Sequence, residues 1–232
     1  MTSTVGFYLF SFNNPIRKQR MTERFQNETI EPTFVPIVEL SDSRLIGAPD
    51  ICKRNWAIMW NHLDMLKTFL ESDNDYGVFC EDDTHIRKGL RKFMPEIVAA
   101  YNRRNLEILL LGYLSTTPPV GISNSVGYTS YEENLIYMTY EDHLWGAHMY
   151  MLDRKTAQKF LSIYTVEYSR ESLKDDNIPH FSPDWTLTKN GRRAVVYPMM
   201  GVEEGHVATS DQGQAEFHKA CHQRHYNPAY YW

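Results

Sequence analysis

The sequence is poor in cysteine and has no long apolar run. Its three cysteines, Cys52, Cys80 and Cys221, are odd in number and far apart, which favours reduced thiols over a disulfide framework. No apolar stretch approaches the length of a membrane-spanning helix, and residues 1–15 lack the basic start of a signal peptide. We therefore expect a cytoplasmic protein with no transmembrane segment.

Clusters of basic residues are also missing. Lys and Arg number 24 against 29 Asp and Glu, the formal net charge is −5, and the basic residues are scattered. Because nucleic-acid binding needs a concentrated positive patch, we expect no nucleic-acid partner. No internal repeat, low-complexity tract or linker divides the chain, and 42% of its 232 residues are hydrophobic. This content is enough for the core of a single domain over residues 1–232.

Apolar runs alternate with helical patterns in the first half of the chain. The predicted strands cover residues 5–12, 33–38, 76–80 and 106–115, and the predicted helices between them cover 13–26, 50–72 and 88–104. Asn14 is suited to cap the first helix, with Pro15 in its first turn. The order βαβαβαβ is typical of the α/β class, with a largely parallel central sheet flanked by helices and ligands beyond the carboxyl ends of the strands.

The second half is less regular. We expect one or two exposed strands or a hairpin at 126–140, a strand at 146–152, a helix at 153–164 capped by Asp153, a loop at 165–183 and a last strand at 193–200. Near the C-terminus, four residues have the spacing of one helix face: His218, Cys221, His222 and His225. Without a second ligand cluster we expect a polar surface helix there rather than a zinc site.

The stretch YGVFCEDDTHI, residues 76–86, places three acids directly after a predicted strand. If Glu81, Asp82 and Asp83 continue the extended backbone, Glu81 and Asp83 point to one side and Asp82 to the other. Adjacent carboxylates raise one another's pKa, so water, basic groups or a metal ion must offset their repulsion. Two hard oxygen donors suit Mn²⁺ or Mg²⁺ and leave coordination positions for a diphosphate. A solvated acidic turn is the alternative.

Several stretches, in order, resemble glycosyltransferase family 25, which includes bacterial lipooligosaccharide and animal procollagen galactosyltransferases. The similar stretches are FSFNNPIRKQRM, MWNHLDMLK, VFCEDDTHI, ILLLG, GAHMYMLDRKTAQKFL, SPDWTL and YPMMGVEEGHVATSD. Glu81-x-Asp83 takes the place of the D-x-D motif of nucleotide-sugar-dependent enzymes. The chain departs from the family at Asn61, where Ser is usual, and at Glu203 or Glu204, where the family has Gln.

This resemblance implies a GT-A fold and inverting transfer of a hexose, galactose or glucose, from a UDP-sugar. The acceptor would be a glycan, a glycoprotein or a hydroxylated side chain, and Mn²⁺ or Mg²⁺ would assist. Glu81 and Asp83 would bind the metal ion. By analogy with many enzymes of this fold, His206 would complete the metal's coordination.

Inverting transfer also needs a general base for the acceptor hydroxyl. Asp184 matches the aspartate of the family's motif in SPDWTL and is the candidate, with Asp142 and Glu141 as rivals. The alternative for Asp184 is that it caps a helix beginning at Trp185.

Four further residues are candidates for binding the donor nucleotide: Asn14, Arg17, His62 and Asp82. Arg17 falls in the Arg-rich segment of the resemblance and suits a diphosphate, although helix arginines often face water. Asp82 suits a ribose hydroxyl or a backbone amide. His62, on the flank of an apolar helix, is equally well explained as a packed, hydrogen-bonded histidine.

Two other classes of function stay open. A divalent-metal phosphohydrolase or nucleotidyltransferase also uses clustered carboxylates, but it needs further acids or a Gly-rich phosphate loop. A non-catalytic glycan-binding protein is the other, because a fold does not fix a function.

Overall fold

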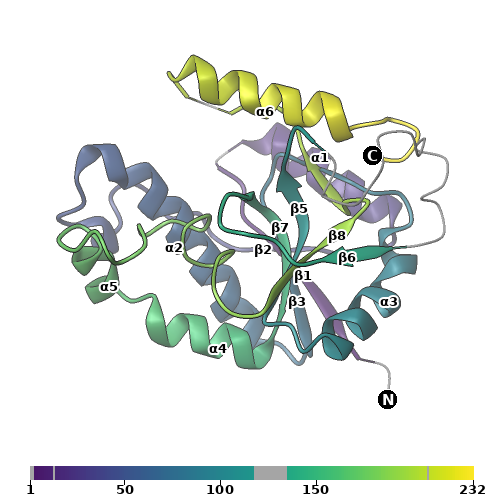
Figure 1. The fold of residues 1–232 in the computed structure, drawn as a ribbon, viewed down its shortest axis with the longest axis horizontal. Helices are drawn as coiled ribbons and strands as arrows, with labels where there is room; N and C mark the ends of the chain where they lie inside the picture. The colour runs from purple at the N-terminus through teal and green to yellow at the C-terminus, as the bar shows by residue number, and fades with distance from the viewer. Residues whose placement is uncertain (1–2, 13, 118–134, 208) are drawn as a thin grey trace.

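A seven-stranded sheet forms the centre of the computed structural model, which describes residues 3–12, 14–117, 135–207 and 209–232 (Figure 1). The strand order is β2-β1-β3-β7-β5-β8-β6. The strands are β1 Val5–Leu9, β2 Thr33–Phe34, β3 Tyr76–Cys80, β5 Ile108–Leu114, β6 Ile136–Met138, β7 Trp145–Asp153 and β8 Arg193–Tyr197. Only β7 and β6 run antiparallel to the others. The predicted α/β class with a largely parallel sheet is confirmed.

Helices cover both faces of this sheet. They are α1 Pro15–Asn27, α2 Asp50–Glu71, α3 Leu90–Arg103, α4 Arg154–Ile163, α5 Val166–Glu171 and α6 Gln212–His225, with a short 3₁₀ helix at Ser43–Leu45. In Figure 1, α2 and α4 lie to the left of the sheet, α3 lies to its right and α6 crosses above it. None of the helices within the described ranges is long and apolar enough to cross a membrane.

Strand alternation divides the apolar side chains between two cores. Along β3, Phe79 faces a core formed with α2 and α4, whereas Val78 and Cys80 face a core formed with α1 and α3. The ring of Phe79 lies 5.6 Å from that of Tyr8 and 5.2 Å from that of Tyr150, measured between centroids. Burial on both faces explains why these strands read as continuous apolar runs in the sequence.

A second, two-stranded sheet pairs β4, Thr84–Ile86, with β9, Gly201–Glu203. The two strands are antiparallel, and Thr84 lies opposite Glu203. The amide of Glu204 also donates a hydrogen bond to the carbonyl of Asp83, over 2.7 Å. This pairing brings acids from two segments that are far apart in the sequence to one place.

Most predicted helices and strands are present, with three corrections. The strand expected at 33–38 is only β2, two residues long. The loop expected at 165–183 begins with helix α5, where the Thr165 hydroxyl accepts the amide of Tyr168. The last helix has the predicted polar outer face, but its inner face is not on the surface, because Cys221 and His225 are buried. The strands or hairpin predicted at 126–140 lie largely outside the described residues, and β6 occupies the described end.

The aromatic packing around Phe79 predicts a strong effect on stability. Phe79→Ala should lower the free energy of unfolding by about 3 to 5 kcal/mol, because the site is fully buried and a cavity remains. The control Ile16→Ala, at a side chain that is 70% exposed on α1, should change it by less than about 0.5 kcal/mol. Urea denaturation of both variants measures the difference. Similar losses in the two variants would contradict the packing described for β3.

Candidate active site

A pocket of about 700 Å³ opens at the carboxyl ends of strands β1, β3 and β5, next to the start of the antiparallel β7. The start of α2, the loop before Trp185 and the residues after β9 complete its walls. Ligands of α/β proteins commonly bind beyond the carboxyl ends of the strands. The pocket therefore lies where the sequence placed the candidate site.

The three acids do not continue strand β3. Glu81 still donates its amide to the carbonyl of His148, over 2.9 Å, but Asp82 and Asp83 form a turn that leads into β4. The premise of an extended backbone through residues 81–83 is therefore wrong. The three acids make different contacts.

Asp82 is bound to the scaffold. Its carboxylate accepts the hydroxyl of Ser11 at 2.7 Å, the amide of Phe12 at 3.1 Å and the guanidinium of Arg17 at 3.2 Å. Only 2% of Asp82 is exposed. Asn14 caps α1 by accepting the amide of Arg17, over 3.1 Å, and is not among the residues that line the pocket. Asp82 thus ties the acidic turn to the end of β1 and the start of α1.

Glu81 leans against a buried histidine. Its carboxylate lies 3.1 Å from Nε2 of His62, and Nδ1 of His62 lies 3.0 Å from the hydroxyl of Tyr150. Burial lowers the pKa of His62 to about 3, so the ring is neutral and carries one proton. If that proton is on Nε2, it is donated to Glu81, and Nδ1 accepts the hydroxyl of Tyr150. His62 stands behind Glu81 and is not among the pocket-lining residues.

The acids that line the pocket repel one another. Desolvation, followed by the charges of Asp184, Asp82 and Glu203, raises the pKa of Glu81 to about 8. Desolvation, followed by the charges of Glu81 and Glu203, raises the pKa of Asp83 well above its ordinary value. Oδ1 of Asp83 is buried without a hydrogen-bond partner in the part of the chain that the structure describes. Arg17 lies 3.8 Å from the other carboxylate oxygen of Asp83, Oδ2, and leaves Oδ1 unsatisfied.

Hard carboxylate oxygens of this kind fit Mn²⁺ or Mg²⁺. Glu81 and Asp83 line the same pocket, as does His206, which is exposed. Over the described ranges, no group of three or more His, Cys, Asp or Glu side chains is arranged to hold a metal ion by itself.

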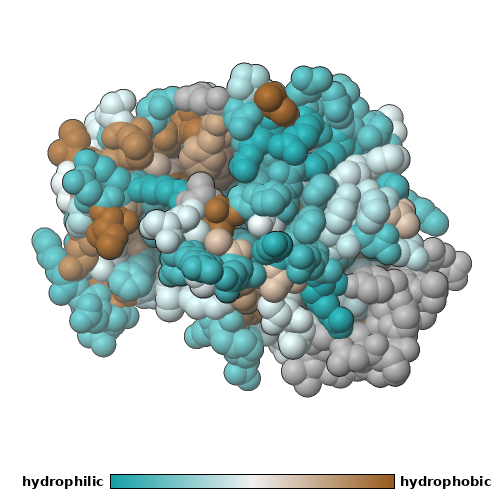
Figure 2. Space-filling model, turned by 90° about the horizontal axis from the view of Figure 1, so that it is seen from above, coloured by the Kyte–Doolittle hydropathy of each residue, from teal (hydrophilic) through white to brown (hydrophobic). Residues whose placement is uncertain are grey.

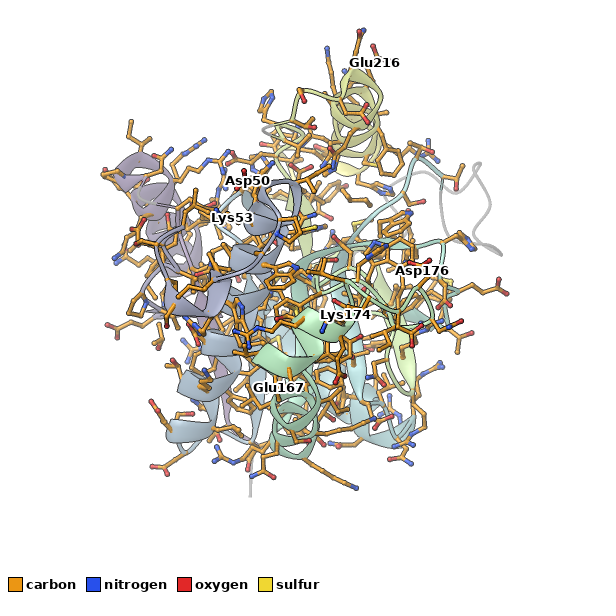
Figure 3. The ribbon with its side chains drawn as sticks, turned by 90° about the vertical axis from the view of Figure 1, so that its left-hand side faces the viewer. Asp50, Lys53, Glu167, Lys174, Asp176 and Glu216 are labelled. Atoms are coloured by element: carbon orange, nitrogen blue, oxygen red, sulfur yellow. The ribbon has the colours of Figure 1, made fainter. Side chains whose placement is uncertain are left out.

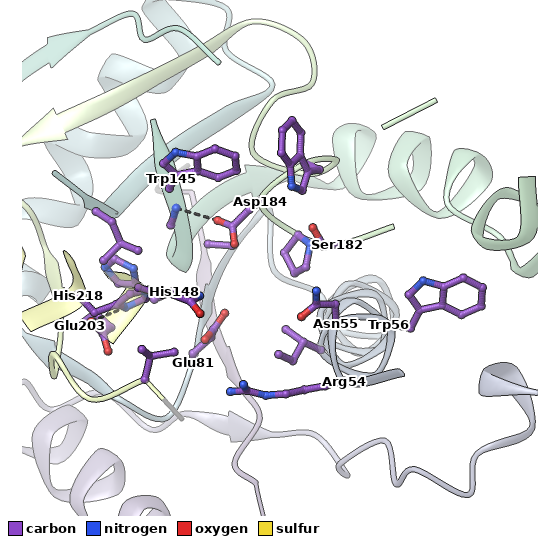
Figure 4. Close-up of a pocket in the computed structure, with 18 of the residues that line it drawn as sticks. Arg54, Asn55, Trp56, Glu81, Trp145, His148, Ser182, Asp184, Glu203 and His218 are labelled. Atoms are coloured by element: carbon purple, nitrogen blue, oxygen red, sulfur yellow. Dashed lines mark hydrogen bonds and ion pairs between the residues drawn. The ribbon is translucent and has the colours of Figure 1, made fainter. Parts of the chain in front are cut away.

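Asp184 faces the acidic turn across the pocket. Figure 4 shows the side chains of Asp184 and Glu81 pointing toward one another. Asp184 accepts the amide of Gly146 at 2.7 Å, and desolvation raises its pKa despite that hydrogen bond. Residues 183–189 form successive turns and no helix, so the alternative in which Asp184 caps a helix is wrong.

The rival base Asp142 lies elsewhere. Its side chain is 76% exposed and pairs with Arg193, and it does not line the pocket. Arg17, by contrast, does line it, 3.8 Å from Asp83. The structure thus brings together Arg17, Glu81, Asp82, Asp83, Asp184 and His206, and leaves Asn14, His62 and Asp142 outside.

The histidines of α6 do not converge on one point. His218 lies 3.2 Å from the carboxylate of Glu203, His222 lies 2.9 Å from the carbonyl of Glu203, and His225 lies 2.7 Å from the carbonyl of Ser115. Their ring nitrogens serve to fasten α6 to β9 and to the end of β5. Of the three, only His218 lines the pocket, together with Glu203 (Figure 4).

Several pocket residues were not predicted from the sequence: Arg54, Asn55, Trp145, His148 and Trp185. Arg54 and Asn55 lie on the first turns of α2 and point into the pocket (Figure 4). Two of the others could have been suspected from their positions in the sequence. Trp185 follows the candidate Asp184 directly, and Trp145 is the first residue of the strand that carries Gly146.

Comparison with known proteins finds no match to a known family, and the likeness to solved structures is weak. No family model and no curated protein matches the chain. A similar solved structure is described as a glycosyltransferase involved in the glycosylation of the major capsid of PBCV-1. It is 10% identical, the match covers 93% of this chain and 98% of that one, and the TM-score is 0.40. A likeness at this level assigns no function, so a proposal has to come from the site.

The raised pKa of Glu81 predicts how pH affects the metal-free protein. The folded state keeps this proton to a pH of about 8, whereas an unfolded glutamate loses it near its ordinary value of 4.5. Between these values the native state binds more protons, so stability falls as pH rises. In Glu81→Gln this loss should be smaller. Thermal unfolding in EDTA between pH 5 and pH 8 measures it.

The control for this measurement is Glu31→Gln, at an exposed glutamate. It should follow the wild-type pH dependence. A Glu81→Gln variant that also follows it would show that Glu81 is ionised throughout this range in the folded state.

Proposed function

We propose that this chain is an inverting, metal-dependent glycosyltransferase of GT-A type. It moves a hexose from a UDP-sugar to a glycan or a hydroxylated acceptor. The observation that carries the proposal is the pocket of about 700 Å³ that Glu81, Asp83 and Asp184 line, all three with raised pKa, and in which Asp184 lies opposite Glu81 (Figure 4). Sugar transfer needs this separation, because the metal and the base act on opposite sides of the reacting carbon.

Glu81 and Asp83 would hold Mn²⁺ or Mg²⁺, and His206 lines the same pocket. The orphaned Oδ1 of Asp83 and the repulsion between the two carboxylates fit a divalent cation. When bound, the cation neutralises charge that develops on the departing diphosphate. Arg17 holds the turn through Asp82 and lies 3.8 Å from Asp83, where its guanidinium can also meet a phosphate oxygen.

Asp184 would act as the general base. The acceptor hydroxyl oxygen forms a bond to the anomeric carbon, the bond from that carbon to the diphosphate breaks, and the hydroxyl proton passes to Asp184. A desolvated carboxylate with a raised pKa is a better proton acceptor than an exposed one. The amide of Gly146 fixes one carboxylate oxygen and leaves the other available.

The alternative of a two-metal phosphohydrolase or nucleotidyltransferase needs a second set of free carboxylates. Glu203 is the further acid beside Asp83, and it is engaged by His218 at 3.2 Å. A glycan-binding protein without activity would release no UDP. Incubation with UDP-glucose or UDP-galactose and Mn²⁺, followed by assay for UDP, separates these functions.

The metal assignment predicts the outcome of binding experiments. UDP with Mn²⁺ should stabilise the wild type by roughly 2.7 kcal/mol at a hundredfold excess over its Kd. Asp83→Ala should lose this stabilisation. Asp82→Ala should keep its dependence on Mn²⁺, although affinity and stability fall because Arg17 and Phe12 lose their partner. Titration calorimetry and thermal shift measure both.

The matched control is Asp176→Ala, at an exposed aspartate in the loop after α5 (Figure 3). It should bind UDP and Mn²⁺ as the wild type does. If Asp83→Ala does so too, the acidic turn is only a surface turn and the metal assignment fails.

The base assignment predicts a separate result. Asp184→Asn should lower turnover by roughly 10² to 10⁴ while UDP affinity in the presence of Mn²⁺ stays near that of the wild type. Asparagine can still accept the amide of Gly146, so the turn should keep its shape. Steady-state assays of UDP release measure this. Full activity in Asp184→Asn, with a large loss in Asp142→Asn, would transfer the role to Asp142.

A further inference from the structure

The pocket has two chemically different halves. Arg17, Glu81 and Asp83 line the half nearest α1 and the acidic turn. Three aromatic side chains line the second half: Trp145 at the start of β7, and His180 and Trp185 from the segment between α5 and β8. We call these three residues the aromatic shelf. Ionic groups on one side and aromatic rings on the other suit a ligand pair in which only one member carries phosphate.

Trp185 is unusually open for its size. It is 41% exposed, although large aromatic side chains are mostly buried on average. Its ring nevertheless has fixed neighbours, because the centroids of Trp145 and His180 lie 4.9 Å and 5.8 Å away, both in edge-on geometry. The ring of Trp185 is therefore held in place while much of its surface stays free.

Lys189 fixes the shelf further. Its Nζ lies 3.5 Å from the ring centroid of Trp145 and 4.1 Å from that of Trp185, so one ammonium group contacts both indoles. This Nζ is buried and has no hydrogen-bond partner among the described residues, so the two rings are its main contacts. An exposed ring that is already immobilised loses little entropy when a ligand covers it.

The shelf also lies next to the candidate base. Trp185 follows Asp184 in the chain, and Trp145 precedes Gly146, whose amide binds Asp184. Both indoles thus belong to the two short segments that hold the carboxylate. A small ring that rests on the shelf has its substituents within reach of Asp184.

From this placement we infer that the aromatic shelf is the acceptor subsite and that it binds a pyranose ring. The C–H face of the sugar stacks on the indole of Trp185, and one ring hydroxyl points at Asp184. The apolar face of a pyranose matches an exposed indole in size, and its hydroxyls suit a neighbouring carboxylate. The inference rests on the proposed function, because it uses Asp184 as the base.

A peptide acceptor fits less well. Extended peptides commonly bind by adding a strand to a sheet edge. The edges of the large sheet are β2 and β6, whereas the pocket opens at the inner strands β1, β3, β7 and β5. The shelf continues instead into apolar surface. Ile51 and Leu173 line the pocket and are 89% and 43% exposed, and Figure 2 shows apolar residues gathered at the end where α2 begins.

The uracil of the donor is a second possible occupant, and position argues against it. A base attached to a diphosphate at Glu81 and Asp83 would have an aromatic neighbour on its own side. Phe12, 39% exposed and bonded through its amide to Asp82, lines that half of the pocket. The shelf is on the side of Asp184 and stays free for the acceptor.

The test measures saccharide binding without donor. Methyl β-D-glucopyranoside, methyl β-D-galactopyranoside and lactose are titrated into wild type, Trp185→Ala and Trp185→Phe, with NMR of the indole N–H groups as the readout. Trp185→Ala should weaken binding of the preferred glycoside roughly tenfold, and Trp185→Phe should retain most of it. In the wild type, the Trp185 indole signal should shift on binding. Affinity for UDP with Mn²⁺ should be equal in all three proteins.

The matched control is Trp232→Ala, at a C-terminal indole that is 37% exposed and bonded to Glu28 outside the pocket. It should bind the glycosides as the wild type does. Equal glycoside affinity in Trp185→Ala and the wild type would overturn the inference, as would a loss of UDP affinity in Trp185→Ala. Binding of a serine- or hydroxylysine-containing peptide, dependent on Trp185, in the absence of glycoside binding would also overturn it.

These outcomes are separable from the proposed function. Trp185-dependent glycoside binding, without UDP release from any donor, supports the subsite and rejects the transferase. Mn²⁺-dependent UDP release with an unchanged acceptor KM in Trp185→Ala supports the transferase and rejects the subsite.

Discussion

Ion pairs between the arginines of α1 and the acids of two turns hold the pocket together. Arg17 binds Asp82 at 3.2 Å, and Arg20 and Arg24 bind Glu204 at 3.3 Å and 2.8 Å. The three arginines are spaced i, i+3 and i+7, so they lie along one face of the helix. That face fixes the turn after β3 and the end of β9, and the acids in the half of the pocket nearest α1 come from these two segments.

In each of the two turns, the arginines bind one acid and leave a neighbouring acid to line the pocket. In the first turn Asp82 is bound to the scaffold, while Glu81 and Asp83 line the pocket. In the second, Glu204 is bound by arginines, while Glu203 faces the pocket beside His218. Adjacent carboxylates are tolerable because each scaffold acid has its own cation, and removing one partner of a buried pair is costly.

Local patterns in the sequence were sufficient for the main helices and strands. The apolar spacing over 50–72 and the capping residues Asn14 and Asp153 each correspond to an observed feature, because periodicity and caps are local properties. Glu81, Asp82 and Asp83 were predicted from a local pattern too, as an acidic group after a strand, whereas Asp184 was proposed from the resemblance of SPDWTL to a family motif. The turn at Asp82 and Asp83 could not be predicted, because the contacts that fix it come from β1, α1 and β9.

Other features depend on contacts between distant segments. The β4–β9 pairing joins residues more than a hundred positions apart, and without it the proximity of Glu203 to Asp83 has no local signal. The exposure of Trp185 also could not be predicted from the stretch SPDWTL, because a tryptophan beside an aspartate can be buried or exposed. Asp142 remained a rival of Asp184 in the sequence because burial has no local signal, and the structure distinguishes the two side chains by their burial.

Some of these acids have close positive partners and others do not, and this difference favours a ligand-binding role for the acids without them. Asp82 and Glu204 have close cations, as expected for acids retained for folding. Glu81 has a neutral histidine, and Asp83 has a buried oxygen without a hydrogen-bond partner among the described residues. Their mutual repulsion opposes folding, so stability does not account for them. A cation bound between a phosphate and these two carboxylates would remove both the repulsion and the unpaired oxygen, which a solvated surface turn would not need.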